Sequence, residues 1–206
     1  MSTETTRQTR SRPRRADVRA QVIQAAAEAF AAHSYADVSV TAIAASAGFT
    51  KGAVYSNFGG KPQLFAAVFA EQFTELVGGA LSDALAAVDV PGSDAPRAVA
   101  ASLTRGVVRG PLPALLAEFR GLAARDPELA AVYSGLRLRQ RLELEELLRG
   151  VADRFGVPDG LDLTVAATLL LTTVNSLAVE HATAPEAFPA DLVEAILTHV
   201  MTGILA

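Results

Sequence analysis

The sequence predicts an all-α protein of about nine helices, and three observations support this fold class. Half of the 206 residues are hydrophobic and 19% are charged, so the chain can bury a sizeable core. Apolar residues recur at spacings of three and four through most of the chain, which is typical of helices with one buried face. Gly, Pro and Asp residues separate these segments, and no strand is predicted. The predicted helices span about 17–33, 40–47, 51–58, 62–88, 95–108, 112–125, 127–155, 162–181 and 190–205.

Particular residues mark where several of these helices begin and end. Gly48 is predicted to adopt a left-handed conformation between the second and third helices, and Thr50 is predicted to cap the third. Thr41 lies near the start of the second helix, where it either caps that helix or faces outward. Pro62 suits the first turn of the fourth helix, because the amide hydrogen that proline lacks would have no partner there. The later breaks fall at residues 91–93, 110–111, 126–127 and 156–160.

The second and third predicted helices have the form of a helix-turn-helix. Each is about seven residues long, and a short turn containing Gly48 joins them. Apolar residues such as Ile43 and Val54 would face the partner helix. The outward residues of the third helix are rich in hydrogen-bond donors and can reach base edges or phosphates in a major groove. The spacing alone also fits a solvated helical hairpin.

The full segment from Val40 to Leu64 is more specific than the spacing. Its pattern is Ile43-Ala44, Ala47-Gly48, Thr50-Lys51-Gly52, Tyr55, Phe58 and Lys61. This pattern closely resembles the signature of TetR-family transcriptional regulators. The resemblance covers about residues 17–70, and the rest of the chain is similar to the family in helix number and layout. It implies a helix-turn-helix DNA-binding domain at 16–61 and a ligand-binding and dimerisation domain at 62–206.

The resemblance also implies which residues bind DNA. They are Thr41, Thr50, Lys51, Gly52, Tyr55, Ser56, Asn57 and Lys61. Thr41 and Lys61 would bind phosphates, and the segment 50–52 would meet phosphate or a base edge with side chains and backbone amides. Tyr55 and Asn57 would hold the DNA backbone, with Ser56 close to the bases. Position 57 is often His in the family, and Asn keeps a donor without a titratable ring.

Positive charge gathers at the N-terminal end of the chain. Residues 1–61 carry eight Lys or Arg against four acidic residues, whereas the remainder carries 10 against 18. A basic head on an acidic body indicates that the head meets a polyanion. Residues 1–15 are predicted to be a disordered basic arm. The arm either enters an adjacent minor groove or adds only non-specific attraction to DNA.

A homodimer is expected, because reading a palindrome needs two recognition helices about 34–36 Å apart. Residues 165–179 and 192–205 carry wide apolar faces with small residues. Two such helices from each copy would form a four-helix interface. The same faces would also serve to complete the core of a monomer.

The middle helices predict a small-molecule site, because a mostly apolar pocket with few polar groups is the usual form of one. The candidate ligand-binding residues are Phe73, Arg105, Phe119, Arg120, Tyr133 and Asn175. Asn175 stands out, because an amide within an apolar helix needs a partner. The predicted function is a repressor of transcription, released from a palindromic operator by a lipophilic effector that tilts the helix from Pro62.

Other functions have less support in the sequence. The chain has no Cys, its three His residues are scattered, and no phosphate loop or nucleophile elbow occurs, so no catalysis, metal or cofactor is expected. No apolar run reaches the length of about 20 residues that spans a bilayer, so we expect no membrane partner and a cytoplasmic location. The alternative is a DNA-binding activator or architectural protein without a ligand, which would share the same head.

Overall fold

The computed structural model describes residues 15–88, 94–109, 112–155 and 160–205. Within these residues the protein has nine α-helices and no strand, which confirms the predicted fold class. The helices are α1 (Arg15–Ala32), α2 (Val40–Ser46), α3 (Lys51–Phe58), α4 (Lys61–Val88), α5 (Ala95–Arg109), α6 (Leu112–Ala123), α7 (Pro127–Phe155), α8 (Leu163–Thr183) and α9 (Ala190–Leu205).

The predicted helix bounds agree with the structure to within about two residues, and two local details differ. Arg15 was predicted to belong to the arm but is the first residue of α1, and the rest of the predicted arm lies outside the described residues. Ser39, not Thr41, caps α2, because the Ser39 side chain accepts a hydrogen bond from the amide of Ala42 at 3.1 Å. Thr41 is therefore left facing outward.

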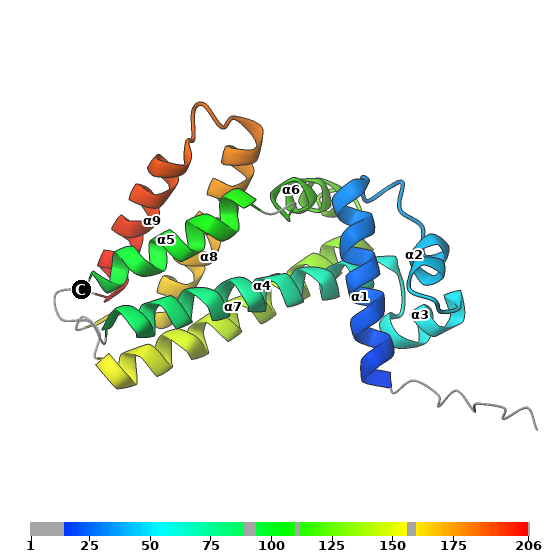
Figure 1. The fold of residues 1–206 in the computed structure, drawn as a ribbon, viewed down its shortest axis with the longest axis horizontal. Helices are drawn as coiled ribbons and strands as arrows, with labels where there is room; N and C mark the ends of the chain where they lie inside the picture. The colour runs from blue at the N-terminus through cyan, green and yellow to red at the C-terminus, as the bar shows by residue number, and fades with distance from the viewer. Residues whose placement is uncertain (1–14, 89–93, 110–111, 156–159, 206) are drawn as a thin grey trace, which may run out of the picture.

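The helices divide the molecule into two ends joined by a long pair (Figure 1). Helices α1–α3 form one end, and α5, α8 and α9 pack together at the other. Helices α4 and α7 contact each other and run between the two ends. Helix α6 contacts α1, α7 and α8, so it connects the two ends of the molecule as well.

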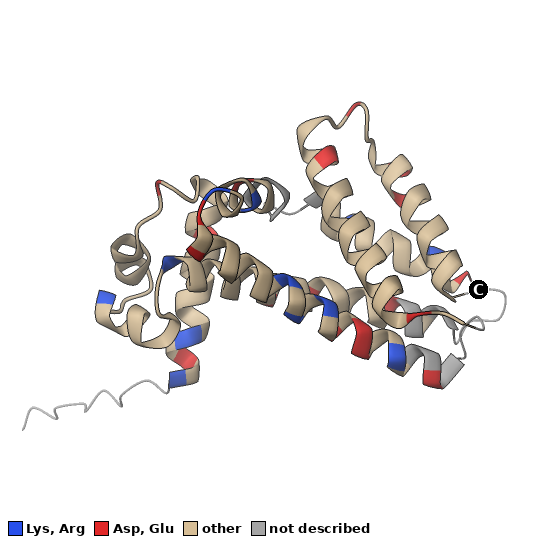
Figure 2. Ribbon diagram, turned by 180° about the vertical axis from the view of Figure 1, so that it is seen from behind, with Lys and Arg blue, Asp and Glu red and all other residues tan. Residues whose placement is uncertain are grey.

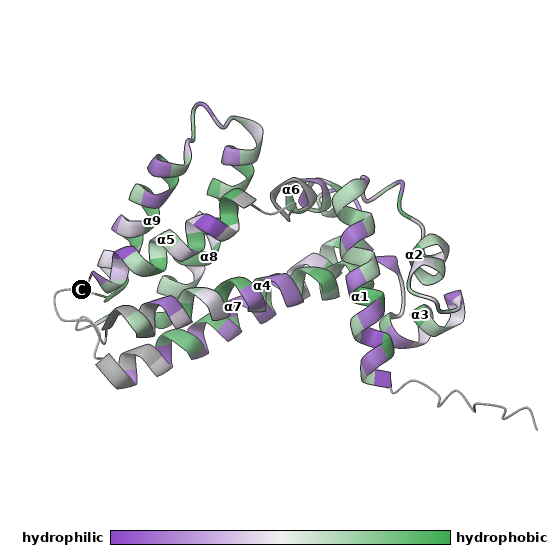
Figure 3. Cartoon of the chain, in the orientation of Figure 1, coloured by the Kyte–Doolittle hydropathy of each residue, from purple (hydrophilic) through white to green (hydrophobic). Residues whose placement is uncertain are grey.

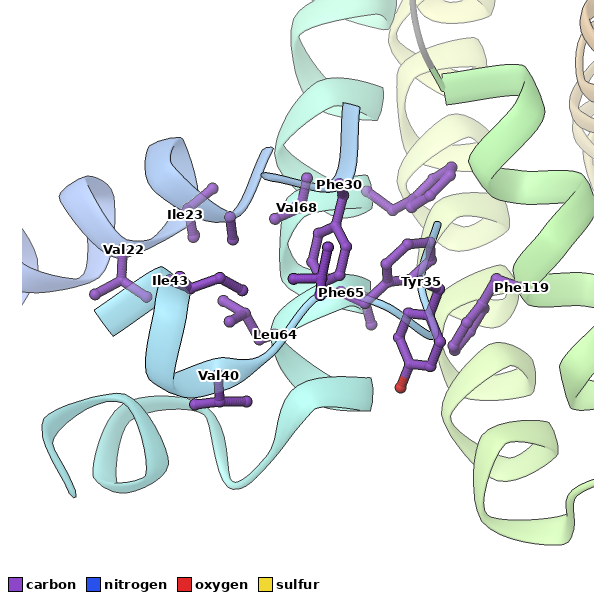
Figure 4. Close-up of a cluster of buried hydrophobic side chains, with 14 of the residues drawn as sticks. Val22, Ile23, Phe30, Tyr35, Val40, Ile43, Leu64, Phe65, Val68 and Phe119 are labelled. Carbon is purple, nitrogen blue, oxygen red and sulfur yellow. The ribbon is translucent and has the colours of Figure 1, made fainter. Parts of the chain in front are cut away.

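Buried side chains form two clusters rather than one. The first cluster, called here the head core, joins α1, α2 and the start of α4 to α6 and the start of α7 (Figure 4). The second, called the body core, joins the rest of α4 and α7 to α5, α8 and α9. Hydrophobic residues face these interiors, and hydrophilic residues lie on the outer faces of the helices (Figure 3). The head core crosses the predicted domain boundary at residues 61–62, which itself stays a prediction.

Two helices are more apolar than the sequence analysis expected. The segment 61–83 of α4 and the whole of α8 are long and apolar enough to cross a membrane by length and composition alone. Polar residues interrupt both segments, such as Glu71 in α4 and Asn175 in α8, so neither is an unbroken apolar run. In the structure both helices pack into the cores: α8 alone buries seven residues, from Ala166 to Ala178. Their hydropathy is explained by this packing between neighbouring helices.

Candidate nucleic-acid interface and effector cavity

Local hydrogen bonds fix the relation between α2 and α3. Gly48 has a φ of +74°, and the amide of Phe49 donates to the carbonyl of Ala44 at 2.8 Å. Glycine adopts this left-handed conformation without steric cost, so the turn closes as predicted. The Thr50 side chain accepts a hydrogen bond from the amide of Ala53 at 3.2 Å, which confirms Thr50 as the cap of α3. The turn and the cap together fix the orientation of α3 relative to α2.

The buried and exposed faces of α3 separate cleanly. Val54 is fully buried in the head core. Lys51, Tyr55 and Ser56 are exposed, and Tyr55 keeps 44% of its surface accessible although it is a large hydrophobic residue. The Lys51 ammonium lies 5.6 Å from the centre of the Tyr55 ring. The Ser56 hydroxyl donates its proton to the carbonyl of Ala53 at 2.9 Å, so its oxygen stays available as an acceptor. The exposed face therefore offers a cation, a phenol and a hydroxyl oxygen on one side of a short, fixed helix.

Gly52 occupies this exposed face without a structural need for glycine. A Cβ atom at this position would meet only the Thr50 hydroxyl, at an ordinary contact distance of 3.9 Å. Its φ lies outside the left-handed region, and it sits in the first turn of α3. A larger residue would thus fit within the protein itself. The missing side chain matters only to something that approaches from outside.

Asn57 is engaged within the protein. Its Nδ2 donates to the carbonyl of Ala53 at 2.7 Å, and its Oδ1 accepts from the Nε of Arg15 at 3.3 Å. The carboxamide therefore joins the end of α3 to the start of α1. Both of its polar ends are occupied, so Asn57 positions Arg15 more directly than it offers a free group to DNA.

Lys61 lies at the junction between the head and the body. Its Nζ donates to the carbonyl of Ala36 at 3.3 Å and lies 4.4 Å from the centre of the Tyr35 ring. Partial burial lowers the pKa of Lys61, while Glu118 and Asp37 oppose this by attraction. Lys61 thus supports the α1–α2 connection, a role that the sequence analysis did not foresee.

The α1–α2 connection is also bound to α6. The backbone amide of Tyr35 donates to the Glu118 carboxylate at 2.8 Å, across 83 residues of sequence. The Tyr35 ring packs among Phe30, Phe65 and Phe119, and its hydroxyl points away from those rings (Figure 4). Burial, followed by the nearby carboxylates, raises the pKa of Tyr35 to about 12. No local pattern in the sequence signals this contact.

Charge is distributed differently over the two ends (Figure 2). The described head carries four basic residues against three acidic ones, namely Arg15, Arg19, Lys51 and Lys61 against Asp17, Glu28 and Asp37. Along α7, by contrast, a group of basic residues at 137–141 is followed by a group of acidic residues at 143–146, and pairs such as Arg141 and Glu145, 3.2 Å apart, offset each other. The head is therefore the end suited to a polyanion.

Two apolar cavities lie in the body, between α4, α5, α7 and α8. The first has a volume of about 100 Å³ and is lined by aliphatic residues together with Phe73 and Asn175. The second has a volume of about 50 Å³, lies toward the head, and includes Gln140 in its lining. Phe73, Leu76, Val174 and Asn175 line both, so the two cavities share a wall.

Two of the six predicted ligand-binding residues, Phe73 and Asn175, line these cavities. Phe119 is fully buried in the head core, and Tyr133 packs at the edge of that core. Arg105 is exposed and pairs with Asp83, and Arg120 is exposed as well. Residues of the middle helices are thus divided between the head core and the body core. The sequence alone does not show which residue belongs to which core. Gln140 was missed, although it interrupts an apolar series at a spacing of four, namely Leu136, Gln140, Leu144 and Leu148.

One outer face of α8 and α9 is apolar and exposed. Val165 is 61% exposed and Leu169 49% on α8, and Leu192 is 40% exposed on α9. A shallow groove of about 410 Å³ runs between the two helices past Leu169, His199 and Gly203. Large exposed apolar side chains beside small residues are typical of a helix-to-helix interface.

No group of three or more potential metal ligands occurs among the described residues. What the fold does present is a short exposed helix after a glycine turn, on a basic head that is fixed to an all-helical body with internal cavities. These features define a helix-turn-helix DNA-binding regulator.

Comparison with known proteins identifies the family. Residues 22–68 match the model of bacterial regulatory proteins of the tetR family, and residues 91–206 match the model of the C-terminal part of BetI-type transcriptional repressors. The chain belongs to the TetR family of transcriptional regulators. A search of curated proteins finds no match.

Solved structures show the same fold at low sequence identity. A TetR-family regulator from Rhodococcus sp. is 15% identical, with a TM-score of 0.71 over 93% of this chain and 100% of that one. A TetR-family regulator from Mesorhizobium loti is 20% identical, with a TM-score of 0.67 over 95% and 100%. SmeT in complex with triclosan is 19% identical, with a TM-score of 0.60 over 92% of both chains.

Proposed function

We propose that this chain is a homodimeric repressor that leaves a palindromic operator when a small apolar effector enters the body cavities. The observation that carries the proposal is the exposed face of α2 and α3. Thr41, Lys51, Tyr55 and Ser56 all lie on the surface, while the caps and Val54 hold the helices in place. A fixed helix with outward donors is what reading a major groove requires.

The DNA contacts that we propose follow this exposure. Thr41 binds a phosphate, and Thr50, Lys51 and Gly52 meet phosphate or a base edge at the start of α3. Tyr55 contacts the DNA backbone, and Ser56 lies nearest the bases.

Two of the proposed DNA-binding residues act from the edge of this face. Asn57 contributes chiefly by holding Arg15 toward the DNA. Lys61 has three N–H donors, so it can keep its bond to Ala36 and still bind a phosphate.

The proposed dimer interface is the exposed face of α8 and α9. Val165, Leu169 and Leu192 would be buried against a second copy, and Ala195 and Gly203 would permit close approach of the helices. A two-fold axis through this face would give a four-helix bundle. It would leave the two heads at the outer ends, where they can meet successive turns of one duplex.

Effector binding is proposed in the two body cavities. Sites for drug-sized ligands have volumes of about 300–1,000 Å³, and these cavities are smaller. A ligand of that size would therefore push α4 and α7 away from α5 and α8. Because α4 starts at the head, such a shift changes the distance between the two heads of a dimer. SmeT, a structural relative, was solved as a complex with triclosan.

We also propose that the protein acts in the cytoplasm, without catalysis or a cofactor. Regulators of this family are soluble DNA-binding proteins and are generally not enzymes. The described His residues lie on or beside different helices: His33 follows α1, His181 lies on α8 and His199 on α9.

Footprinting on the promoter region of the protein's own gene tests the DNA-binding proposal. The double variant Lys51→Ala, Tyr55→Ala is expected to lose protection, because it removes a cation and a phenol from the exposed face. The control is Arg139→Ala, which removes an exposed cation from α7 and should leave protection intact. Undiminished protection in the double variant would refute the proposed interface.

A further inference from the structure

The two body cavities are neighbours that share part of their lining. Phe73, Leu76 and Val174 belong to the walls of both cavities. Apart from Asn175, every side chain that lines the larger cavity is apolar. The smaller cavity adds Gln140, which is only 5% exposed. The two cavities, taken together, are called here the joined cavity, and their polar groups are confined to the end nearer the head.

The chemistry of the neighbouring atoms fixes how both carboxamides are oriented. Asn175 meets the carbonyl of Leu171 at 2.7 Å, and a carbonyl only accepts, so the Asn175 atom there must be Nδ2. Gln140 meets the guanidinium of Arg137 at 3.1 Å, and a guanidinium only donates, so the Gln140 atom there must be Oε1. The remaining atoms, Asn175 Oδ1 and Gln140 Nε2, make no hydrogen bond among the described residues.

Both residues line the smaller cavity, so one free acceptor and one free donor belong to the same lining. No charged side chain among the described residues lines either cavity. A carboxylate placed there would gain the Gln140 donor but would face the Asn175 oxygen. An ammonium group would gain the Asn175 acceptor but would face the Gln140 amide hydrogens. The nearest charge is the Arg137 guanidinium, which is bonded to Gln140 and does not line either cavity. Burying an ion that does not reach this guanidinium is strongly unfavourable, whereas a hydroxyl or a primary amide both donates and accepts.

We infer that the joined cavity binds an uncharged ligand with an alkyl or similar apolar body and a terminal hydroxyl or primary amide, which Gln140 and Asn175 recognise together. This inference rests on the proposed function in taking the cavities as the effector site. It adds the chemical class of the effector and the two residues that select it. The aliphatic part of the ligand would lie among Leu103, Leu144 and Leu148 in the larger cavity.

Three probes with the same tail and different head groups test the inference on the full-length protein. Isothermal titration calorimetry at neutral pH compares octanol, octanoate and octylammonium. Octanol is expected to bind at least about tenfold more tightly than either ion, because only the ions must bury a charge. Equal or tighter binding of either ion, or no binding of octanol, would overturn the inference.

Two variants test whether the carboxamides of Gln140 and Asn175 cause the preference for octanol over the two ions. Gln140→Met and Asn175→Leu keep the volume of the side chain and remove its polar end. Each should weaken octanol binding about fivefold by removing one buried hydrogen bond, and should narrow the ratio of octanol to octanoate affinity. A general loss of packing would weaken all three probes alike and leave that ratio unchanged, which would count against the inference.

Gln24→Met is the matched control, because it makes the same exchange on the exposed face of α1. It should bind all three probes as the parent does, and a fivefold loss in this variant would also contradict the inference. Operator affinity is measured in the same mixtures. Octanol that binds selectively without releasing DNA would refute the proposed switch and leave this inference standing.

Discussion

The head core and the body core are built from different kinds of side chain. Phe30, Tyr35, Phe65, Phe69 and Phe119 contact one another in the head core, with ring centres 4.4–6.0 Å apart. The buried residues of the body core are Val, Leu, Ala, Ile and Met, without a buried aromatic ring. The two cavities open among these aliphatic side chains or at the seam with the head core.

This contrast suits two mechanical roles. Interlocked rings resist rearrangement, because aromatic pairs prefer particular edge-to-face or offset geometries. Aliphatic side chains around a cavity have several packing arrangements of similar energy. A DNA-binding domain needs a core that resists rearrangement. A domain that binds small molecules needs a core that can repack around a ligand. If the two cores differ in this way, equivalent substitutions in them should have unequal effects on stability.

The largest expected effect is that of Phe119→Ala. Phe119 is fully buried and contacts the rings of Tyr35 and Phe65. Its removal should lower the free energy of unfolding by about 3–5 kcal/mol, measured by urea denaturation. Leu144→Ala, in the wall of the larger cavity, should cost about 2 kcal/mol, because the surrounding helices can close around it. The opposite ranking would mean that the body core is the more tightly packed of the two.

Alkaline pH should destabilise the head core through Tyr35. Its pKa is about 12 in the folded protein and 10.0 as the ordinary value, so the unfolded chain loses the phenol proton first. Stability is unaffected below about pH 10 and falls between pH 10 and 12, by close to 3 kcal/mol in all. Tyr35→Phe removes this titration, so thermal unfolding of the variant should lack that loss. An identical loss in parent and variant would assign it to another group.

Overpacking should distinguish the two cores directly. Ala26 is fully buried in the head core, and Ala26→Leu should cost about 1–3 kcal/mol because no space is available there. Ala80 is also buried but lines the larger cavity, so Ala80→Leu should be nearly neutral for stability. The Ala80 variant should also lose octanol binding, as calorimetry would show. Equal costs for both substitutions would remove the proposed difference.

Gly52→Ala, on the surface of the head, should change stability only slightly. The new methyl group fits, and alanine should stabilise α3 by up to about 1 kcal/mol. The same methyl group would stand between α3 and a phosphate or base edge, so affinity for the operator should fall. A variant that is more stable and still binds DNA fully would show that DNA does not approach Gly52 closely.

Much of this architecture is predictable from the sequence because its signals are local. The cap at Thr50, the turn at Gly48 and the spacing of apolar residues define α2 and α3 within a window of about twenty residues. The exposed positions of α3 follow from the same periodicity. Neither the helix bounds nor this face depends on distant parts of the chain.

The cavity lining was harder to predict because it depends on how distant helices pack. Phe73 and Phe119 are equally apolar in sequence, yet one lines the cavities and the other fills the head core. Gln140 shares a buried face of α7 with leucines, and only its place opposite Asn175 in the smaller cavity makes it a candidate for ligand binding. The Tyr35–Glu118 bond likewise depends on α6 returning to the head.

The Tyr35–Glu118 bond limits which segments of this regulator can be replaced by those of a related protein. A chimera that joins residues up to Lys61 to a foreign body would leave the Tyr35 amide without Glu118 and expose the rings of Phe30 and Tyr35. The transplanted unit would have to include the start of α4, α6 and the first turns of α7. For recombination, the DNA-reading module is therefore a discontinuous set of segments rather than the N-terminal third of the chain.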